Sequence, residues 1–193
     1  RHANWERCES YECVLLGCGW GTSLQRRILL QRLISRSTRG VIDADGINLL
    51  SHLPPRPLGP DWVLTPHIGE LARLVDRSTS EIGDDLVGAV CEAAEAWSCT
   101  VIGKSHVLTI AGLDGSHVVV DGMNAAMGTG GTGDVLAGVV AGLLASGLSG
   151  MEASLCGVGL HQRAGQILRG TSGFFAADQL IGQVRRLSDA LER

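Results

Sequence analysis

The sequence predicts an α/β fold built on a mostly parallel sheet, and three observations lead to that prediction. Short β-type runs alternate with helical segments along the 193 residues, which is typical of parallel sheets. Hydrophobic residues make up 45% of the chain and charged residues 19%, so the chain can bury a sizeable core. Since a domain takes about 150 residues, the length predicts a single domain over residues 1–193.

The first half of the chain is expected to supply three strands and four helices. A β-type run ends in the glycine-rich segment Gly17–Gly21, and Ser23 is placed to cap the amphipathic segment that follows. The prolines of segment 54–57 predict a loop. In chain order the expected elements are strand 12–16, helix 23–36, strand 40–43, helix 47–53, strand 62–64, helix 68–75 and helix 79–98.

The second half is expected to supply three strands and three helices. Asp114-Gly115 is a hairpin signal between two of the strands. Ser149 and Glu152 have the spacing of a capping box at the start of a helix. In chain order the expected elements are strands 100–103, 107–111 and 117–120, a glycine-rich loop over 122–133, and helices 132–146, 149–168 and 176–191.

The apolar helix over 132–146 is expected to pack directly on the sheet. Val135, Val139 and Leu143 recur at helical spacing and are therefore expected to face the core. Gly138 and Gly142 are expected to allow close approach of the neighbouring elements.

Charge and hydropathy argue against two classes of protein. A net charge of −4 argues against a nucleic-acid partner, because such proteins show a clustered basic excess. The longest charge-free apolar run, 135–148, is shorter than the ~18 residues of a membrane span, so no membrane partner is expected. No signal-peptide pattern opens the chain. The six cysteines have no zinc-ligand spacing and are expected to be reduced thiols, which favours a cytoplasmic protein.

The sharpest chemical motif is a glycine-rich loop that runs into a helix. Residues 127–134 read M-G-T-G-G-T-G-D, and glycines let backbone N–H groups converge on an anion where the helix dipole adds positive charge. Asp134 suits a general base that takes a hydroxyl proton while the N–H groups stabilise an arriving phosphoryl group. The alternative is a glycine turn with Asp134 as a helix cap.

Lys104 is the single lysine among 16 basic residues. Lysine and arginine differ in donor geometry and reach, so a lysine kept in an arginine-rich chain is a candidate functional group. Codon bias toward arginine is the alternative explanation.

Three further segments accompany the glycine-rich loop in a fixed order. They are L-G-C-G-W-G at 16–21, V-I-D-A-D-G-I-N at 41–48 and T-P-H-I-G-E at 65–70. Together with residues 124–144 they resemble the G-P-G-L-G, D-A-D-x-x-N, T-P-H-x-G-E and anion-hole segments of the ADP/ATP-dependent NAD(P)H-hydrate dehydratases, within the ribokinase-like superfamily. The resemblance implies a ribokinase-like three-layer fold. It also implies that the S-epimer of NADH or NADPH hydrated at C6 is phosphorylated on that hydroxyl and then loses phosphate, which restores the cofactor.

The resemblance also implies roles for individual residues. Asp134 is implied as the catalytic base, and Mg²⁺ as the cofactor, with Glu70 arranging the ion through water. Gly19, Gly21, His67 and Asp134 are implied to contact the hydrated dinucleotide. The residues implied to bind ADP or ATP are Lys104, Ser105, His106, Asn124, Thr129, Gly130, Gly131, Thr132 and Gly133.

Several of these residues have a plainer explanation. His67 can be an N-terminal helix residue that bonds the backbone, and Glu70 a first-turn acid favoured by the helix dipole. Asp43 and Asp45 are expected to hold loops by hydrogen bonds. Four histidines share no spacing and, on spacing alone, are expected to be ordinary polar residues: His52, His106, His117 and His161.

The chain departs from the family pattern at Ser105, where the family has glycine, and at Ala125-Ala126, where it often has Pro-Gly. Members of the family also carry further residues before the first glycine-rich loop. The sheet is therefore expected to lack its N-terminal strands and to depend on residues before Arg1 or on a second polypeptide. An epimerase domain is the other candidate for a preceding segment. The resemblance further suggests ADP as the nucleotide and a homo-oligomer.

Two other functions remain open from the sequence. One is a small-molecule alcohol kinase of the same superfamily, acting on a hydroxymethylpyrimidine, a thiazole or a sugar with Asp134 in the same role. The other is a non-catalytic nucleotide-binding subunit, against which the intact Asp134 counts.

Overall fold

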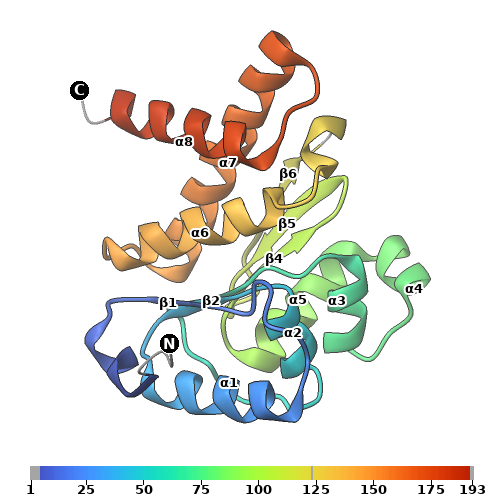
Figure 1. Cartoon of the computed structure of the whole chain (residues 1–193). Helices are drawn as coiled ribbons and strands as arrows, with labels where there is room; N and C mark the ends of the chain where they lie inside the picture. The colour runs from blue at the N-terminus through green and yellow to red at the C-terminus, as the bar shows by residue number, and fades with distance from the viewer. Residues whose placement is uncertain (1–4, 123, 192–193) are drawn as a thin grey trace.

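The computed structural model describes residues 5–122 and 124–191 and contains one six-stranded sheet with helices on both faces (Figure 1). The strands are β1 (Val14–Leu16), β2 (Gly40–Ile42), β3 (Trp62–Leu64), β4 (Thr100–Lys104), β5 (Val107–Ala111) and β6 (His117–Asp121), and they lie in the sheet in chain order. β1 to β4 pair in parallel, and β5 and β6 add two antiparallel pairings. The predicted α/β class with a mostly parallel sheet is confirmed.

The helices form two outer layers (Figure 1). One layer holds α1 (Leu24–Arg36), α2 (Asp45–Leu50), α3 (Ile68–Leu74), α4 (Thr79–Asp84) and α5 (Leu86–Trp97). The other holds α6 (Thr132–Ala145), α7 (Gly150–Ser172) and α8 (Ala177–Leu191). Two 3₁₀ turns complete the described elements, η1 (Trp5–Ser10) and η2 (Ala125–Gly128). Among the described helices, none is both long and apolar enough to cross a membrane.

Side-chain caps decide where several helices begin. Ser149 accepts a hydrogen bond from the backbone N–H of Glu152, so the predicted capping box at the start of α7 is confirmed. The single helix expected over 79–98 is wrong, because the chain breaks at Asp85 into α4 and α5. Asp85 leaves helical geometry at φ −141° and ψ 67°, and its carboxylate accepts the N–H of Gly88 at 2.9 Å. An aspartate that can cap a new helix competes with continuation of the old one.

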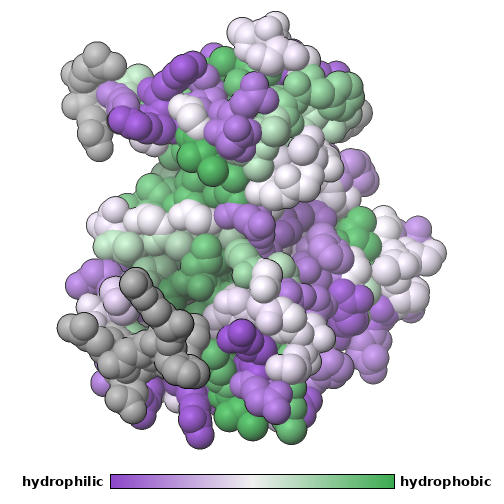
Figure 2. Space-filling view, viewed as in Figure 1, coloured by the Kyte–Doolittle hydropathy of each residue, from purple (hydrophilic) through white to green (hydrophobic). Residues whose placement is uncertain are grey.

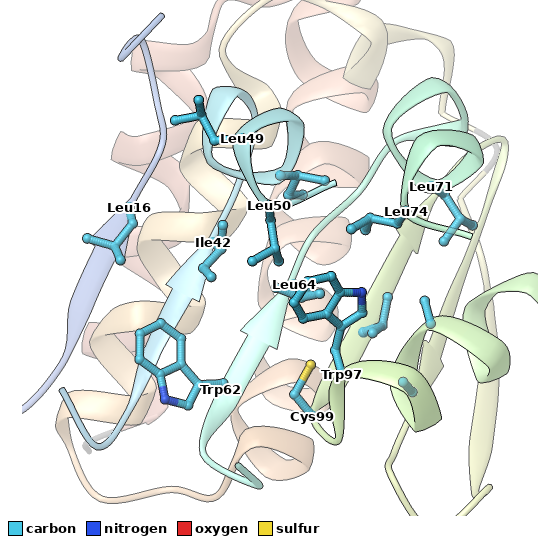
Figure 3. Packing of buried hydrophobic residues seen from close by; sticks show 14 of the residues in the cluster. Leu16, Ile42, Leu49, Leu50, Trp62, Leu64, Leu71, Leu74, Trp97 and Cys99 are labelled. Atoms are coloured by element: carbon cyan, nitrogen blue, oxygen red, sulfur yellow. The ribbon is translucent and has the colours of Figure 1, made fainter. Parts of the chain in front are cut away.

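The larger core lies between the sheet and the layer of α1 to α5. Figure 3 shows Leu16, Ile42 and Leu64 of the parallel strands directed toward leucines of α2 and α3. Trp62 and Trp97 fill the far end of this core, each 1% exposed. The parallel strands β2 and β3 are buried along their whole length, as expected of strands that have helices on both faces.

The face of α6 that packs on the sheet differs from the expected one. Leu136, Val140 and Leu144 are buried at 1% exposure or less, whereas Val135 and Val139 are partly buried against a separate cluster between α6, α7 and α8. Because α6 lies between the sheet and α8, both sides of the helix are apolar. Helical spacing alone cannot distinguish two apolar faces.

The two glycines expected to allow close packing of α6 do not have that role. A Cβ atom added at Gly138 or Gly142 would meet nothing within 4 Å, so the expected role of these two glycines is wrong. On α7, however, a Cβ at Gly157 would lie 2.7 Å from Cγ2 of Val140. Gly157 is therefore the residue that lets α7 pack closely against α6.

β1 is the edge strand of the sheet and pairs, within the described residues, with β2 alone. Leu15 of this strand is 37% exposed, and Figure 2 shows a hydrophobic area beside β1 beneath α6. The expected pairing of this edge with further residues stays a prediction.

We expect Gly157→Ala to lower the free energy of unfolding by about 1–3 kcal/mol, the usual cost of adding a methyl group to a packed contact. Gly138→Ala is the matched control, because it adds the same methyl group to an exposed helical site in open space. It should raise the free energy of unfolding by roughly 0.5–1 kcal/mol. Urea denaturation of the two variants measures both changes, and equal effects would contradict the assigned packing.

Candidate functional site

The carboxyl ends of the four parallel strands meet the N-terminal end of α6 at one edge of the sheet. Gly17 follows β1, Asp43 follows β2, Thr65 follows β3 and Lys104 ends β4. In an open parallel sheet, this is the edge where ligands bind. Four chemically distinct segments of the sequence therefore lie together at this edge of the sheet.

Asp43 is the buried centre of the site. Its side chain is 2% exposed, and its Oδ1 atom accepts hydrogen bonds from Thr65 Oγ1 and Lys104 Nζ, both at 2.7 Å. Gly17 is required beside it, since φ is +118° and an added Cβ would overlap the carbonyl oxygen of Asp43. The expectation that Asp43 holds neighbouring segments by hydrogen bonds is confirmed.

Asp45 holds the glycine-rich loop that follows β1. Its Oδ2 atom accepts a hydrogen bond from the N–H of Gly21 at 2.7 Å. The expectation that Asp45, like Asp43, holds a loop by hydrogen bonds is therefore confirmed. Gly19 is exposed in the same loop. The two glycines implied to contact the dinucleotide thus lie at the surface, close to the Asp43 site.

Cys18 lies between two carboxylates. The Sγ atom is 3.9 Å from Oδ2 of Asp43, and ligand atoms of Cys18, Asp43 and Asp134 all lie within 4.8 Å of one another. Burial first, and then the negative charges of Asp43 and Asp134, raise the pKa of Cys18 to about 12. The thiol therefore stays protonated, while the exposed Asp134 faces solvent in the first turn of α6.

The glycine-rich loop is fixed at the start of α6. Gly131 is the N-cap with φ +90°, and Thr132 Oγ1 donates to the carbonyl oxygens of Met127 at 2.7 Å and Thr129 at 2.9 Å. The backbone N–H of Thr132 donates to the Thr129 carbonyl at 3.3 Å. This amide of the glycine-rich loop therefore already has a partner within the protein. Lys104 Nζ lies 3.3 Å from where a Cβ of Gly133 would be, so its charge adds to the helix dipole.

His67 is the N-cap of α3. Its Nδ1 atom accepts the N–H groups of Gly69 at 3.0 Å and Glu70 at 3.3 Å, and Glu70 Oε2 accepts the N–H of His67 at 2.9 Å. Since Nδ1 accepts, a neutral ring carries its proton on Nε2, which lies 3.3 Å from Glu70 Oε1. The explanation of His67 as a helix cap is confirmed. Because Nδ1 is occupied by backbone N–H groups, a dinucleotide would have to contact the rest of the imidazole ring.

Glu70 is 4% exposed, and burial is the main cause that raises its pKa. Both carboxylate oxygens contact His67. The residue does not fit a direct Mg²⁺ ligand, since that ion demands near-ideal octahedral geometry and keeps several waters. A contact through water stays a prediction.

A cleft of about 620 Å³ opens beside the glycine-rich loop. Six of the nine residues implied to bind nucleotide line it, namely Lys104, Ser105, His106, Asn124, Thr132 and Gly133. Thr129, Gly130 and Gly131 lie in the adjoining loop outside the lining. The structure thus brings most of the implied nucleotide residues to one cavity.

The sequence reasoning missed the contribution of α7 to this cleft. His161, Gln162 and Arg169 line it. His161 is 5% exposed, and its Nε2 donates to the carbonyl oxygen of Thr132 at 2.9 Å. Burial lowers the pKa of His161, so the ring is neutral and supports the loop. Treating His161 as an ordinary polar residue was wrong, and nothing in its spacing signals the contact.

Comparison with known proteins gives the family. A family model described as NAD(P)H-hydrate dehydratase matches residues 1–186. The chain belongs to the NAD(P)H-hydrate dehydratase family. It is 33% identical over 176 residues to the ADP-dependent (S)-NAD(P)H-hydrate dehydratase of Neisseria meningitidis, covering 88% of this chain and 59% of that protein. It is 34% identical over 151 residues to the bifunctional NAD(P)H-hydrate repair enzyme Nnr of Coxiella burnetii, covering 78% of this chain and 30% of that enzyme.

Solved structures of the dehydratase family have the same fold. The ADP/ATP-dependent NAD(P)H-hydrate dehydratase of Bacillus subtilis, co-crystallised with ATP and Mg²⁺, matches with a TM-score of 0.82 at 22% identity, over 96% of this chain and 69% of that one. A hydroxyethylthiazole kinase of Pyrococcus horikoshii matches with a TM-score of 0.67 at 16% identity, over 96% of this chain and 77% of that one. The dehydratase is more similar to this chain than the thiazole kinase is. A ribokinase-like superfamily protein of Enterococcus faecalis matches with a TM-score of 0.83 at 25% identity, over 96% of this chain and 66% of that one. The predicted ribokinase-like fold is therefore confirmed.

The contribution of the Lys104–Asp43 ion pair to stability can be tested by substitution. We expect Lys104→Met to lower the free energy of unfolding by about 3 kcal/mol, because it leaves a buried carboxylate without its partner. Adding Asp43→Asn to that variant should restore part of the loss, since the buried charge is then removed. Urea denaturation of the two single variants and the double variant gives the coupling. Strictly additive effects would show that the pair contributes nothing.

Proposed function

We propose that the chain carries out the ADP- or ATP-dependent dehydration of the S-epimer of hydrated NADH or NADPH. The observation that carries this proposal is the position of Asp134. It lies exposed in the first turn of α6, beside the glycine-rich loop and a lysine held by a buried carboxylate. The name of the Neisseria relative supports the substrate. The chain spans 59% of that relative and 30% of the Coxiella enzyme, so the activity of the whole protein is part of the proposal.

Asp134 is assigned the general-base role. Its carboxylate takes the proton of the C6 hydroxyl while that oxygen forms a bond to the terminal phosphorus of the nucleotide. The bond between this phosphorus and its bridging oxygen breaks, so AMP leaves from ADP, or ADP from ATP. The C6–O bond then breaks with release of phosphate, and loss of the proton at C5 restores the double bond of the nicotinamide ring. The net change is removal of the elements of water from the substrate.

The remaining residues neutralise charge. The N–H groups of Gly131 and Gly133 and the ammonium of Lys104 lie at the N-terminal end of α6, where negative charge develops on the transferred phosphoryl group. Ser105, His106 and Asn124 line the cleft assigned to the nucleotide. Mg²⁺, when bound with the nucleotide, neutralises phosphate charge, and no residue of this site is assigned as its direct ligand.

The alternatives are separated by one assay. The chain is incubated with hydrated NADH, ADP or ATP, and Mg²⁺, and the absorbance of the NADH band is followed. A rising band supports the dehydratase and gives the preferred nucleotide. An alcohol kinase would phosphorylate its own substrate without restoring NADH, and a non-catalytic subunit would do neither. A homo-oligomer, a preceding epimerase domain and a cytoplasmic location stay predictions.

Asp134→Asn should reduce turnover by roughly 10²–10⁴-fold, which is the contribution of a general base. Nucleotide affinity should stay within a few-fold, because the backbone anion site is intact. The same absorbance assay and a nucleotide titration measure the two effects. The alternative of Asp134 as the helix cap is wrong, because Gly131 is the N-cap and no side chain of the described residues caps the start of α6. Turnover near that of the unmodified chain would leave Asp134 as a first-turn acid that only complements the helix dipole.

The charge of Lys104 is best tested in a background that lacks the buried carboxylate. Comparing Asp43→Asn with the double variant Asp43→Asn/Lys104→Met removes the ammonium without stranding Asp43. We expect the double variant to bind ADP more weakly by ~1–3 kcal/mol, the range of a hydrogen bond to a charged group. Isothermal titration calorimetry measures the difference. Equal ADP affinity in the two proteins would make the lysine a structural residue only.

A further inference from the structure

Three metal-ligating side chains meet at the catalytic edge of the sheet. Cys18 comes from the loop after β1, Asp43 from the end of β2 and Asp134 from the first turn of α6. Their ligand atoms all lie within 4.8 Å of one another. The three elements are distant in sequence, so the fold itself assembles this donor set.

The spacing is close to that of a coordination sphere. Four-coordinate Zn²⁺ binds sulfur at about 2.3 Å and oxygen at about 2.0 Å, which places a sulfur and an oxygen ligand roughly 3.5 Å apart. The Cys18 Sγ atom and the Asp43 Oδ2 atom are 3.9 Å apart. The two atoms would have to approach by only about 0.4 Å to share an ion.

The charge balance also favours a cation. Lys104 and Thr65 both bond to Oδ1 of Asp43, whereas Oδ2 is the oxygen directed toward Cys18. Asp43, Asp134 and a Cys18 thiolate would together carry three negative charges against the one positive charge of Lys104. A divalent cation neutralises the remaining two.

The site is closed on one side and open on the other. Asp43 is 1% exposed and partly buried Cys18 lies beside it, whereas Asp134 is exposed. An ion can therefore enter past Asp134 and keep water in a fourth position, the arrangement of three protein ligands and one open position found in many zinc sites.

Cys18 decides which metal ions this donor set prefers. A thiolate selects soft ions over Mg²⁺, which prefers oxygen.

We propose that Cys18, Asp43 and Asp134 form a binding site for a thiophilic divalent cation, Zn²⁺ or Cd²⁺. The ion takes the place of the thiol proton and occupies an oxygen of Asp134. Because Asp134 is the base in the proposed reaction, the bound ion blocks that reaction. Binding itself does not depend on the proposed function.

The test is a Cd²⁺ titration of the reduced, metal-free 193-residue chain without nucleotide or substrate. Calorimetry gives the affinity, and the ultraviolet sulfur-to-cadmium charge-transfer band reports a thiolate ligand. We expect one equivalent to bind with that band. Cys18→Ser should abolish the band of this equivalent and weaken binding at least about tenfold, and Asp134→Asn should weaken binding by a similar factor.

Cys156→Ser is the matched control, because Cys156 is an exposed cysteine on α7 outside the donor set. It should leave both the band and the affinity unchanged. Retention of the band and the affinity in Cys18→Ser, loss of both in Cys156→Ser, or equally tight binding of Mg²⁺ would each overturn the proposal.

A measurement on the unmodified chain covers the case in which Cys18→Ser fails to fold. Zn²⁺ should slow alkylation of Cys18, measured by mass spectrometry of its peptide, and leave alkylation of Cys91 and Cys156 unchanged. Equal alkylation of Cys18 with and without Zn²⁺ would overturn the proposal.

Discussion

The carboxylate of Asp43 is 2% exposed, so its charge has to be matched by donors of the protein and not by bulk water. Thr65 and Lys104 supply those donors from the ends of two neighbouring strands. One buried charge thereby fixes the ends of β2, β3 and β4 relative to each other. It also holds the ammonium of Lys104 beside Gly133, where the first turn of α6 begins. Stability and the electrostatics of the candidate site depend on the same hydrogen bonds.

α6 connects this buried pair to the surface. Its sheet side is anchored by Leu136 and Val140, and its first turn is held from α7 by the hydrogen bond of His161 to Thr132. A glycine-rich loop would otherwise be flexible, because glycine loses more conformational freedom on folding than other residues. The threonine and histidine contacts therefore fix the N–H groups before any ligand arrives, and preorganised donors are the most effective ones in catalysis.

The sequence predicted the fold class, six helices and six strands with shifted ends. Most of the residues implied to bind nucleotide also line the cleft. Those predictions succeed because strand–helix alternation, serine caps and a glycine-rich loop are local signals. The failures concern information that is not local. Asp85 ends one helix by capping the next, and the sheet-facing side of α6 is set by where α8 lies. The pairing of Lys104 with Asp43 spans 61 residues, and His161 meets Thr132 across 29. The hydrophobic periodicity within one segment cannot predict contacts between residues so far apart in sequence.

The mixed sheet divides the molecule into two parts that differ in contact order. β4, β5 and β6 are antiparallel neighbours joined by short turns within residues 100–121, and pairings this local form fast because little chain entropy is lost in closing the loop. β1 to β4 need a crossover connection for every pairing, which is slower. Lys104 ends β4, the strand shared by both parts. We therefore expect β4 and its Lys104 to be in place early, together with β5 and β6. The ion pair with Asp43 can form only after β2 and β3 have paired with β4. From this contact order, we expect the candidate site to be among the last parts of the molecule to form during folding.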